Sequence, residues 1–207
     1  MKNYLLVGLG NPGIKYERNR HNIGFCLIDY FTSQINSEDY IDKFNSKYTL
    51  VRLNDNKIHI IKPQTYMNRS GVSVRNCKDF FKIAPDNIIV VYDDMDLALG
   101  SLKIKSSGGS AGHNGIKSLI DEIGSNNFVR IRIGIGKPLN KENVNNYVLS
   151  NFKKDEFEAL SRIKNRIEEI IKDIIFEGII FAMNKFNSKI QWILTVKIQG
   201  GKHGFIK

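Results

Sequence analysis

The sequence predicts a single three-layer α/β domain, in which helices cover both faces of a twisted, mixed and mostly parallel sheet. Its 207 residues are enough for one domain with a proper hydrophobic core. Strand-like apolar segments alternate with segments of helical periodicity, and no repeat or linker divides the chain. The apolar run at 87–92 is typical of a strand that is buried on both faces in the middle of a sheet.

Five elements are expected in the first half of the chain. Apolar residues recur at helical spacing within 23–35, and the turn-forming Asn-Asp-Asn at 54–56 separates two strand-like segments, as in a hairpin. The expected elements are strands at 4–9, 48–53 and 57–61, and helices at 23–35 and 71–81.

The second half continues the alternation. Strands are expected at 87–92, 101–105 and 129–135, with a short helix at 115–123 between the last two. Apolar residues then recur every three or four positions, which predicts one amphipathic helix from 154 to about 181. The residues of its apolar face are Phe157, Leu160, Ile163, Ile167, Ile170 and Ile174.

Composition places the chain among globular proteins, with 42% hydrophobic and 25% charged residues. No apolar run is long enough to cross a bilayer, and the N-terminus does not resemble a secretion signal. Cys26 and Cys77 lack partners at metal-ligand spacing, so we expect buried, reduced thiols in a cytoplasmic protein. The net charge of +10 favours a polyanionic partner such as nucleic acid or a membrane surface.

The last residues differ from the rest of the chain. Residues 189–207 carry four lysines and no acid, and so supply +4 of the net charge of +10. A Gly-Gly pair interrupts their β-prone stretch. We therefore expect a folded domain at 1–188 and a basic, poorly ordered C-terminal appendage at 189–207.

The glycines at 8–13 formally match the dinucleotide-binding fingerprint, which suggests an NAD(P)-dependent oxidoreductase. That fingerprint requires a helix that begins within the glycines. Here a polar run at 15–22 follows, and helical periodicity begins only at Ile23. The alternative that we favour is a glycine-rich turn at the carboxyl edge of the sheet, where ligand sites of α/β proteins lie.

His21 stands just before the first helix, and histidine is the usual general base near neutral pH. Asp93, Asp94 and Asp96 follow the central strand, so their carboxylates can reach the same crevice and orient an imidazole. A solvated acidic turn or a metal cluster are the alternatives, although three acids without a nearby histidine make a weak metal site.

Two further segments carry polar groups. Residues 62–71 follow a strand, and Asn68 there can bind a peptide or an oxyanion, or simply cap the next helix. The glycine-dense segment 107–115 enters a helix and can cradle phosphate, although it lacks the Lys-Ser/Thr pair of a P-loop. His113 and Asn114, at the helix start, are available to a ligand.

Two pairs of cations lie two residues apart on strands, so the members of each pair share a face. They are Lys103 with Lys105, and Arg130 with Arg132. Either pair can grip phosphates, or can be an ordinary solvated strand edge. Together with the net charge, these cations are also consistent with a non-catalytic RNA-binding protein. In such a protein the His and Asp residues would have no catalytic role.

Five blocks together resemble the bacterial peptidyl-tRNA hydrolase family, in its order and spacing. They are Gly8–Gly13 with Arg20-His21-Asn22-Ile23-Gly24-Phe25, Lys62–Gly71, Asp93–Asp96, Gly108–Gly115 and Phe128–Pro138. The resemblance spans residues 1 to about 187. It implies a monomeric catalytic domain at 1–188, without metal or organic cofactor, that hydrolyses the ester between a peptide and the terminal ribose of tRNA.

The resemblance also implies site residues. His21 matches the catalytic base that activates a water, Asp93 matches its partner, and Asn11 matches a residue that helps hold His21 or the peptide. Further residues match positions that bind the peptide, the 3′ end or the 5′ phosphate of tRNA: Tyr16, Tyr66, Met67, Asn68, His113, Asn114, Lys103, Lys105 and Arg132.

This chain departs from the family pattern in two places. Asn19 stands where the family usually has Thr, and Asn can cap or hydrogen-bond in its place. The tail at 189–207 has no counterpart in the family pattern.

Overall fold

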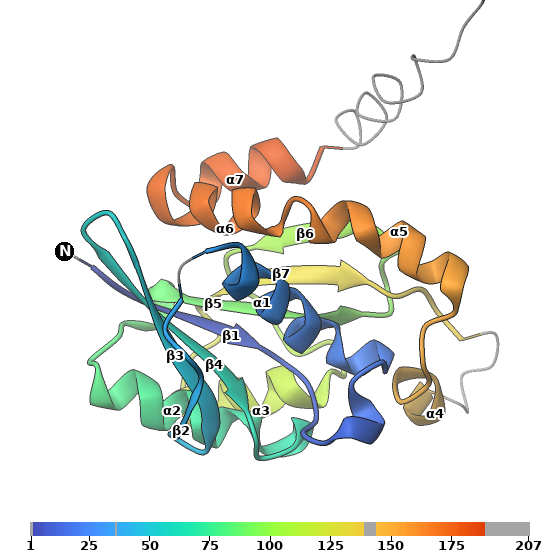
Figure 1. Cartoon of the computed structure of the whole chain (residues 1–207), viewed down its shortest axis with the longest axis horizontal. Helices are drawn as coiled ribbons and strands as arrows, with labels where there is room; N and C mark the ends of the chain where they lie inside the picture. Colours follow the sequence, from blue (N-terminus) through green and yellow to red (C-terminus); the bar gives the residue numbers. More distant parts are fainter. Residues whose placement is uncertain (1, 36, 139–143, 189–207) are drawn as a thin grey trace, which may run out of the picture.

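A computed structural model describes residues 2–35, 37–138 and 144–188, and these form the expected three-layer α/β domain (Figure 1). One mixed sheet of seven strands has the order β2-β3-β4-β1-β5-β7-β6. The strands are β1 (Asn3–Gly8), β2 (Ile41–Lys43), β3 (Ser46–Leu53), β4 (Asn56–Pro63), β5 (Ile88–Asp94), β6 (Leu102–Lys105) and β7 (Val129–Gly134). The tail at 189–207 lies outside the described residues, and so does the prediction made for it.

The parallel part of the sheet is its centre. β4, β1, β5 and β7 run parallel to one another, whereas β2, β3 and β6 join antiparallel at the two edges. The carboxyl ends of β1 and β5 therefore meet at one edge of the sheet, and Gly8 pairs there with Val91. This is the edge where ligand sites of α/β sheets form.

Helices cover both faces of the sheet. The bounds are α1 (Ile23–Gln34), α2 (Ser70–Phe80), α3 (Asn114–Ile123), α4 (Val144–Val148), α5 (Lys154–Lys164), α6 (Ile167–Phe176) and α7 (Ile179–Phe186). α1 and α5 to α7 pack on one face, and α2 and α3 pack on the other (Figure 1). Alternate residues of β5 divide between the two cores, because successive side chains of a strand point to opposite faces.

The prediction of a single helix from 154 to about 181 is wrong. The chain forms three helices there, with breaks at Asn165–Arg166 and at Glu177–Gly178. Gly178 has a φ of 91°, which lets the chain turn back so that α7 packs on α6. The expected apolar residues from Leu160 to Ile174 are nevertheless buried. The break at Asn165–Arg166 is short, so the apolar residues on either side of it still face the sheet.

The other expected elements are confirmed to within one or two residues, including the hairpin of β3 and β4. The sequence analysis missed two short elements, β2 and α4, and several turns of 3-10 helix. Elements of three to five residues are too short to show a period of apolar residues.

Gly8 and Gly24 bring α1 close to the sheet. A β-carbon at Gly24 would lie 2.4 Å from the carbonyl oxygen of Val91 and 2.5 Å from the nitrogen of Leu9. One at Gly8 would lie 2.7 Å from the carbonyl oxygen of Gly24. Because both positions lack side chains, the start of α1 lies directly on the ends of β1 and β5. The helix does not begin within the glycines at 8–13, so the geometry of a dinucleotide fold is not formed.

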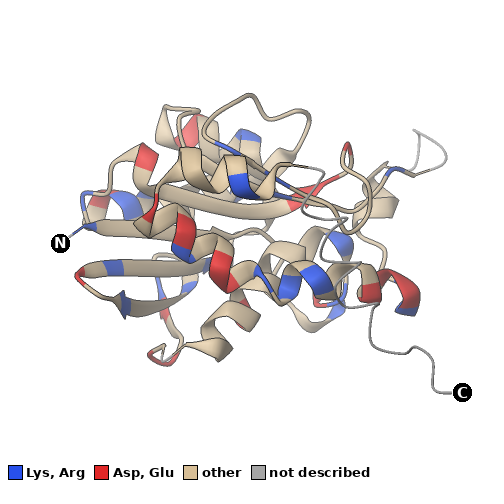
Figure 2. Cartoon of the chain, turned by 90° about the horizontal axis from the view of Figure 1, so that it is seen from above, with Lys and Arg blue, Asp and Glu red and all other residues tan. Residues whose placement is uncertain are grey.

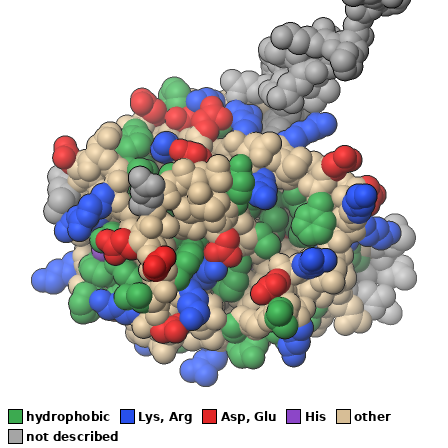
Figure 3. Space-filling view, viewed as in Figure 1, with side chains coloured by type: hydrophobic (Ala, Val, Ile, Leu, Met, Phe, Trp, Pro, Cys, Tyr) green, Lys and Arg blue, Asp and Glu red, His purple; other side chains and the backbone are tan. Residues whose placement is uncertain are grey.

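The surface mixes charges of both signs. Basic and acidic residues are interspersed along the helices and strands (Figure 2), and on the face in Figure 3 apolar side chains lie between the charged ones. No helix in the described part of the chain is long and apolar enough to span a membrane. Of the two thiols expected to be buried, Cys77 is buried, but Cys26 is exposed.

His59 lies in the apolar core on β4. Its ring stacks on Phe81 at 3.7 Å between centroids, and its Nδ1 is 3.0 Å from the hydroxyl of Tyr48. Burial, together with the nearby cations of Lys57 and Lys43, lowers the pKa of His59 to about 4. The folded protein therefore holds His59 neutral.

We predict that this group makes stability depend on pH between about 6.5 and about 4. In that window the unfolded chain binds a proton at His59 and the folded chain does not, so the free energy of unfolding falls as the pH falls. The loss should be on the order of 2 to 3 kcal/mol. Urea unfolding of the wild type and His59→Gln at several pH values measures it. The difference between the two proteins cancels the other titrating groups, and a difference independent of pH would contradict the prediction.

Candidate active site

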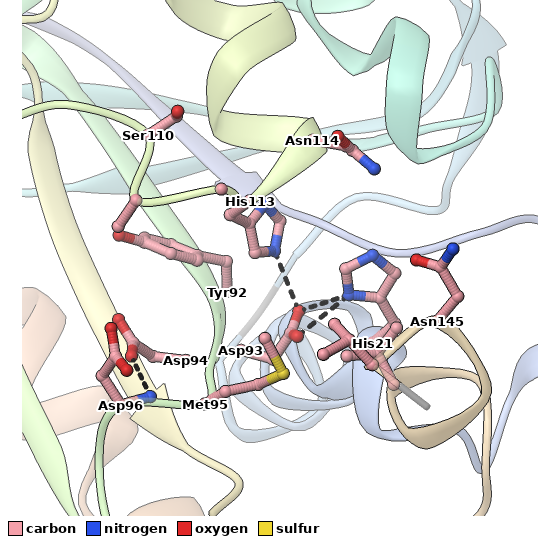
Figure 4. Close-up of a pocket in the computed structure, with 14 residues that line it drawn as sticks. His21, Tyr92, Asp93, Asp94, Met95, Asp96, Ser110, His113, Asn114 and Asn145 are labelled. Atoms are coloured by element: carbon pink, nitrogen blue, oxygen red, sulfur yellow. Dashed lines mark hydrogen bonds and ion pairs between the residues drawn. The ribbon is translucent and has the colours of Figure 1, made fainter. Parts of the chain in front are cut away.

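The site lies at the carboxyl edge of the sheet, beside α1. His21 lies in a 3-10 turn, Arg20–Asn22, immediately before α1 begins at Ile23. Asp93 is the penultimate residue of β5, and His113 is the N-cap residue of α3. Three elements that are far apart in sequence thus bring these side chains together (Figure 4).

Two imidazoles share the carboxylate of Asp93. Nδ1 of His21 is 2.8 Å from Oδ1 and 2.9 Å from Oδ2, and Nε2 of His113 is 3.1 Å from Oδ1. The two ring centroids are 5.0 Å apart. All three side chains are largely buried, so these hydrogen bonds are shielded from water and strengthened.

The hydrogen bonds assign the protons of both rings. The backbone N–H of Ile116 donates to Nδ1 of His113, so Nδ1 is unprotonated and Nε2 carries the proton that it donates to Asp93. His21 donates its Nδ1 proton to the same carboxylate. In the neutral ring Nε2 of His21 is therefore the nitrogen without a proton, and none of the described residues hydrogen-bonds to it. Figure 4 shows this nitrogen on the side of the ring away from Asp93.

Asp93 is held in its ionised form. Burial alone would raise the pKa of this carboxyl, but the N–H groups that His21 and His113 point at it attract and hydrogen-bond its ionised form, which outweighs burial and holds the pKa well below its ordinary value. An ionised Asp93 accepts the Nδ1–H hydrogen bond of His21 and so fixes the tautomer and the orientation of the ring.

A cavity of about 70 Å³ adjoins the His21–Asp93 pair. One wall is the segment Ser110–Asn114, and the opposite wall is α4, which contributes Val144, Asn145 and Val148. Asn114 and Asn145 are exposed and present their amides on either side of His21 (Figure 4). The sequence analysis missed Asn145, because nothing in the pattern at 144–148 separates it from its polar neighbours.

The three acids after β5 have different surroundings. Asp93 and Asp94 are consecutive strand residues and so point to opposite faces. Asp94 accepts from Nε of Arg132 at 2.5 Å and from the backbone N–H of Asp96 at 2.8 Å. Asp96 pairs with Lys137 at the surface. Of the three, Asp93 is the acid that reaches His21.

His21, Asp93 and His113 also place possible metal-ligand atoms within 4.8 Å of one another. A metal on Nε2 of His113 would require the ring proton on Nδ1, where it would meet the Ile116 N–H donor. The hydrogen bonds therefore fit a protonated Nε2 better than a metal ligand. They also show that His113, expected to be available to a ligand, already uses both ring nitrogens within the protein.

Asn11 and Asn22 connect the turn after β1 to the segment before α1 and to the turn at Met67. The backbone N–H of Asn11 donates to Oδ1 of Asn22 at 2.9 Å, and Nδ2 of Asn22 donates back to the carbonyl of Asn11 at 2.9 Å. Oδ1 of Asn11 accepts from the backbone N–H of Met67 at 2.8 Å. Asn11 therefore holds the segments on either side of the site, and Asn22 is a partner that the sequence analysis did not single out.

Met67 was expected to bind the substrate, but its side chain is buried and does not reach the surface. It is 3% exposed and packs with the core below α2 and α3, where a β-carbon at Gly115 would lie 2.4 Å from its sulfur. Asn68 is exposed on the 3-10 turn Met67–Arg69 and does not cap α2, for which Arg69 is the N-cap residue.

Tyr16 and Tyr66 come together although 50 residues separate them. Their ring centroids are 6.4 Å apart in an edge-to-face arrangement. Tyr66 is 56% exposed, and its φ of 59° turns the chain sharply between β4 and the turn that carries Asn68. The pair forms an aromatic surface near Asn11. Tyr66 is close to Asn11 because the next residue, Met67, donates its backbone N–H to the Asn11 side chain.

The cations of β6 and β7 share one face of the sheet. Lys103 is directly opposite Arg132, and Lys105 is directly opposite Arg130. α2 and α3, the described helices on that face, pack on strands other than β6. Lys103 and Lys105 of β6 are therefore exposed. Lys105 and Arg132 line a second cavity of about 330 Å³, which shares Tyr92 and Ala111 with the first.

Arg130 is not available for a ligand. It is 2% exposed and donates to the carbonyls of Gly108 and Gly109, the latter at 2.6 Å. The glycine-dense segment thus presents carbonyls to an internal guanidinium at these two positions, where the sequence suggested a cradle of amides for phosphate. Arg132 remains partly exposed, with its Nε held by Asp94.

The fold and the site define an α/β enzyme with a histidine–aspartate pair at the carboxyl edge of its sheet. A family model, "Peptidyl-tRNA hydrolase", matches residues 5–192. Peptidyl-tRNA hydrolases of Clostridium botulinum and Clostridium novyi are 45% and 42% identical over 184 residues, which are 89% of this chain and 96% and 97% of theirs. The crystal structure of peptidyl-tRNA hydrolase from Acinetobacter baumannii has a TM-score of 0.85 at 34% identity, over 89% of this chain and 94% of that one. The chain belongs to the peptidyl-tRNA hydrolase family and is a hydrolase.

We predict that the two roles of His113 can be separated by substitution. His113→Ala removes both the N-cap acceptor for Ile116 and the hydrogen bond to Asp93, whereas His113→Asn restores a cap but is too short to reach Asp93. Because Asn is a good N-cap residue, His113→Asn should be more stable than His113→Ala by about 1 kcal/mol. Urea unfolding measures the difference, and equal stabilities would show that the cap contributes nothing.

Proposed function

We propose that this protein hydrolyses the ester between the carboxyl end of a peptide and the terminal ribose of tRNA, with His21 as general base and Asp93 as its orienting partner. The observation that carries the proposal is the contact of Nδ1 of His21 with a buried carboxylate beside a cavity, which leaves Nε2 as the proton acceptor of the neutral ring. Membership of the peptidyl-tRNA hydrolase family supports the substrate.

The nucleophile in this proposal is water. Nε2 of His21 takes a proton as the water oxygen adds to the ester carbonyl carbon, and Asp93 stabilises the imidazolium that forms. The tetrahedral intermediate then collapses, the bond to the ribose oxygen breaks, and His21 returns the proton to that oxygen. The products are a peptide carboxylic acid and a tRNA with a free ribose hydroxyl. Ser110 lines the cavity, but within the described residues its side chain has no hydrogen bond to either imidazole.

Exposed amides and aromatic rings suit recognition of the substrate near the ester. Asn114 lines the cavity and can donate to the carbonyl oxygen as negative charge develops there. Asn68 and Asn11 would bind the peptide backbone or support its position, and the rings of Tyr16 and Tyr66 would stack on a base or ribose of the 3′ end. Met67 acts from below, as part of the core that supports these residues.

The cationic face of β6 and β7 suits the 5′ phosphate of tRNA. Lys105 and Arg132 line the adjoining cavity, and Lys103 is directly opposite Arg132. Phosphate contacts recognise no sequence, so they would let one enzyme act on many tRNAs. The guanidinium of Arg132 is oriented by Asp94, which leaves its two terminal nitrogens for a phosphate.

The same proposal includes a monomeric enzyme that works in the cytoplasm, where peptidyl-tRNA arises, without a metal or an organic cofactor. The internal hydrogen bonds of His113 support it, because they leave the ring without a free nitrogen for a metal.

Replacing the proposed base tests the mechanism. We expect His21→Ala to release peptide from peptidyl-tRNA about 10²- to 10⁴-fold more slowly than the wild type, with both assayed in the presence of a chelator. His59→Gln is the matched control, a histidine in the core whose loss should leave the rate unchanged at neutral pH. No release by the wild type under chelator would refute hydrolysis without metal, and a near-full rate in His21→Ala would refute the base.

The phosphate contacts should make the reaction sensitive to salt. We expect kcat/KM to fall steeply with salt concentration, and Lys105→Ala to reduce the slope of the log–log plot by about 1, because one phosphate contact is lost. Lys172→Ala on α6, which removes a partly exposed lysine paired with Glu168, is the control. Equal slopes for Lys105→Ala and the wild type would exclude this contact.

A further inference from the structure

Arg20 directly precedes His21, and its side chain is almost fully buried, with 5% of its surface exposed. Its Nη2 donates to both carboxylate oxygens of Glu156, at 2.9 and 2.8 Å, and its Nε donates to Oγ of Ser150 at 3.2 Å. Glu156 is itself oriented, because it also accepts from the backbone N–H of Lys153 at 2.7 Å. The residue before His21 is thus joined to the first turn of α5.

The guanidinium of Arg20 also contacts α4 and the segment that follows it. Its carbon lies 4.4 Å from the ring centroid of Tyr147 and 5.0 Å from that of Phe152. The hydroxyl of Tyr147 donates to the carbonyl of Ile135 at 2.6 Å, so this ring is fixed to the residue that follows β7.

The main chain forms the same connection. The backbone N–H of Arg20 donates to the carbonyl of Ser150 at 3.0 Å, and Asn19 forms an isolated antiparallel bridge with Asn151. The N–H of Phe152 donates to the carbonyl of Arg18 at 3.3 Å. The strand-like segment 18–20 is therefore paired with 150–152 immediately before His21.

These contacts join the two sides of the cavity. His21 lies on one side, and Val144, Asn145 and Val148 of α4 form the wall on another. Tyr147 belongs to the same short helix as that wall and stacks on the guanidinium. One buried side chain thus connects the segment that bears the base with the wall that a substrate would touch.

Stability alone does not call for an ion pair here. A buried pair must overcome the cost of desolvating both charges, and apolar residues of similar size often serve equally well. In addition, Nη1 of Arg20 is buried without an acceptor in the described part of the chain. A guanidinium held at Nη2 by both oxygens of Glu156 and at Nε by Ser150 has a fixed geometry, which apolar packing alone does not supply.

We propose that Arg20, with Glu156 as its partner, is a positioning residue that sets the place of His21 relative to the α4 wall of the cavity. The proposal rests on the role of His21 as base. Displacement of a reacting group by about 1 Å can cost on the order of 10²-fold in rate. The effect belongs in kcat, because neither Arg20 nor Glu156 lines the cavity.

We expect Arg20→Met to lower kcat about 10- to 100-fold with a much smaller change in KM. Arg20→Lys should lie between, because it keeps the charge but not the fixed geometry of the guanidinium. The double variant Arg20→Met/Glu156→Met removes the charge that Arg20→Met leaves unpaired, so it should regain stability but not kcat. Asp173→Asn, which breaks a partly buried ion pair with Lys185 far from the cavity, is the control that should keep kcat.

A measurement without substrate keeps this test separate from that of the base. The Nδ1 proton of His21, hydrogen-bonded to Asp93, should give a far-downfield proton resonance that His21→Ala removes. We expect this resonance to shift or broaden in Arg20→Met and in the double variant, and to stay unchanged in Asp173→Asn. A double variant with wild-type kcat and an unshifted resonance would overturn the proposal. A near-full rate in His21→Ala would instead refute the base, and the resonance would still show whether Arg20 positions His21.

Discussion

The arrangement of the site depends on one buried carboxylate, that of Asp93, which accepts hydrogen bonds from two imidazoles. A lone buried carboxylate would be costly, and His21 and His113 offset that cost with two N–H donors. The same bonds determine which ring nitrogen of His21 is free. They also join the start of α1 to the start of α3 across the end of β5. The same hydrogen bonds therefore orient His21 and hold these elements together at this edge of the sheet.

The unequal covering of the sheet explains the second feature of the molecule. α1 and α5 to α7 cover one face, whereas α2 and α3 cover only part of the other, so the cations of β6 and β7 stay near the surface. Asp94 and Arg130 have different structural roles on that face. Asp94 orients Arg132, and Arg130 holds the glycine-dense segment that borders both cavities. A site for an ester and a site for a phosphate can therefore lie side by side.

Several site residues were identifiable from the sequence, but their surroundings were not. The position of His21 before a helix and of Asp93 at a strand end predicted a shared crevice, because parallel strands end at one edge. His113 was nevertheless expected to be free for a ligand, and Met67, through the family resemblance, to contact the substrate. Both errors have one origin: a turn residue can point into the protein or out of it, and only the packing of η3, the turn Met67–Arg69, against α3 determines which.

By itself, the sequence determined the order of the main strands and helices, the central parallel strands and the edge where polar groups gather, since these follow from periodicity and chain order. Periodicity and spacing left open which of three aspartates reaches His21, and only the family resemblance pointed to Asp93. The tertiary structure decided that Asp93 contacts His21, that Arg130 is used internally, and that α4 with Asn145 closes the cavity. It also decided that the helical segment after 154 breaks into three. These outcomes depend on contacts between residues 20 or more positions apart, and in some cases more than 100, such as Arg20 with Glu156, and no local pattern encodes them.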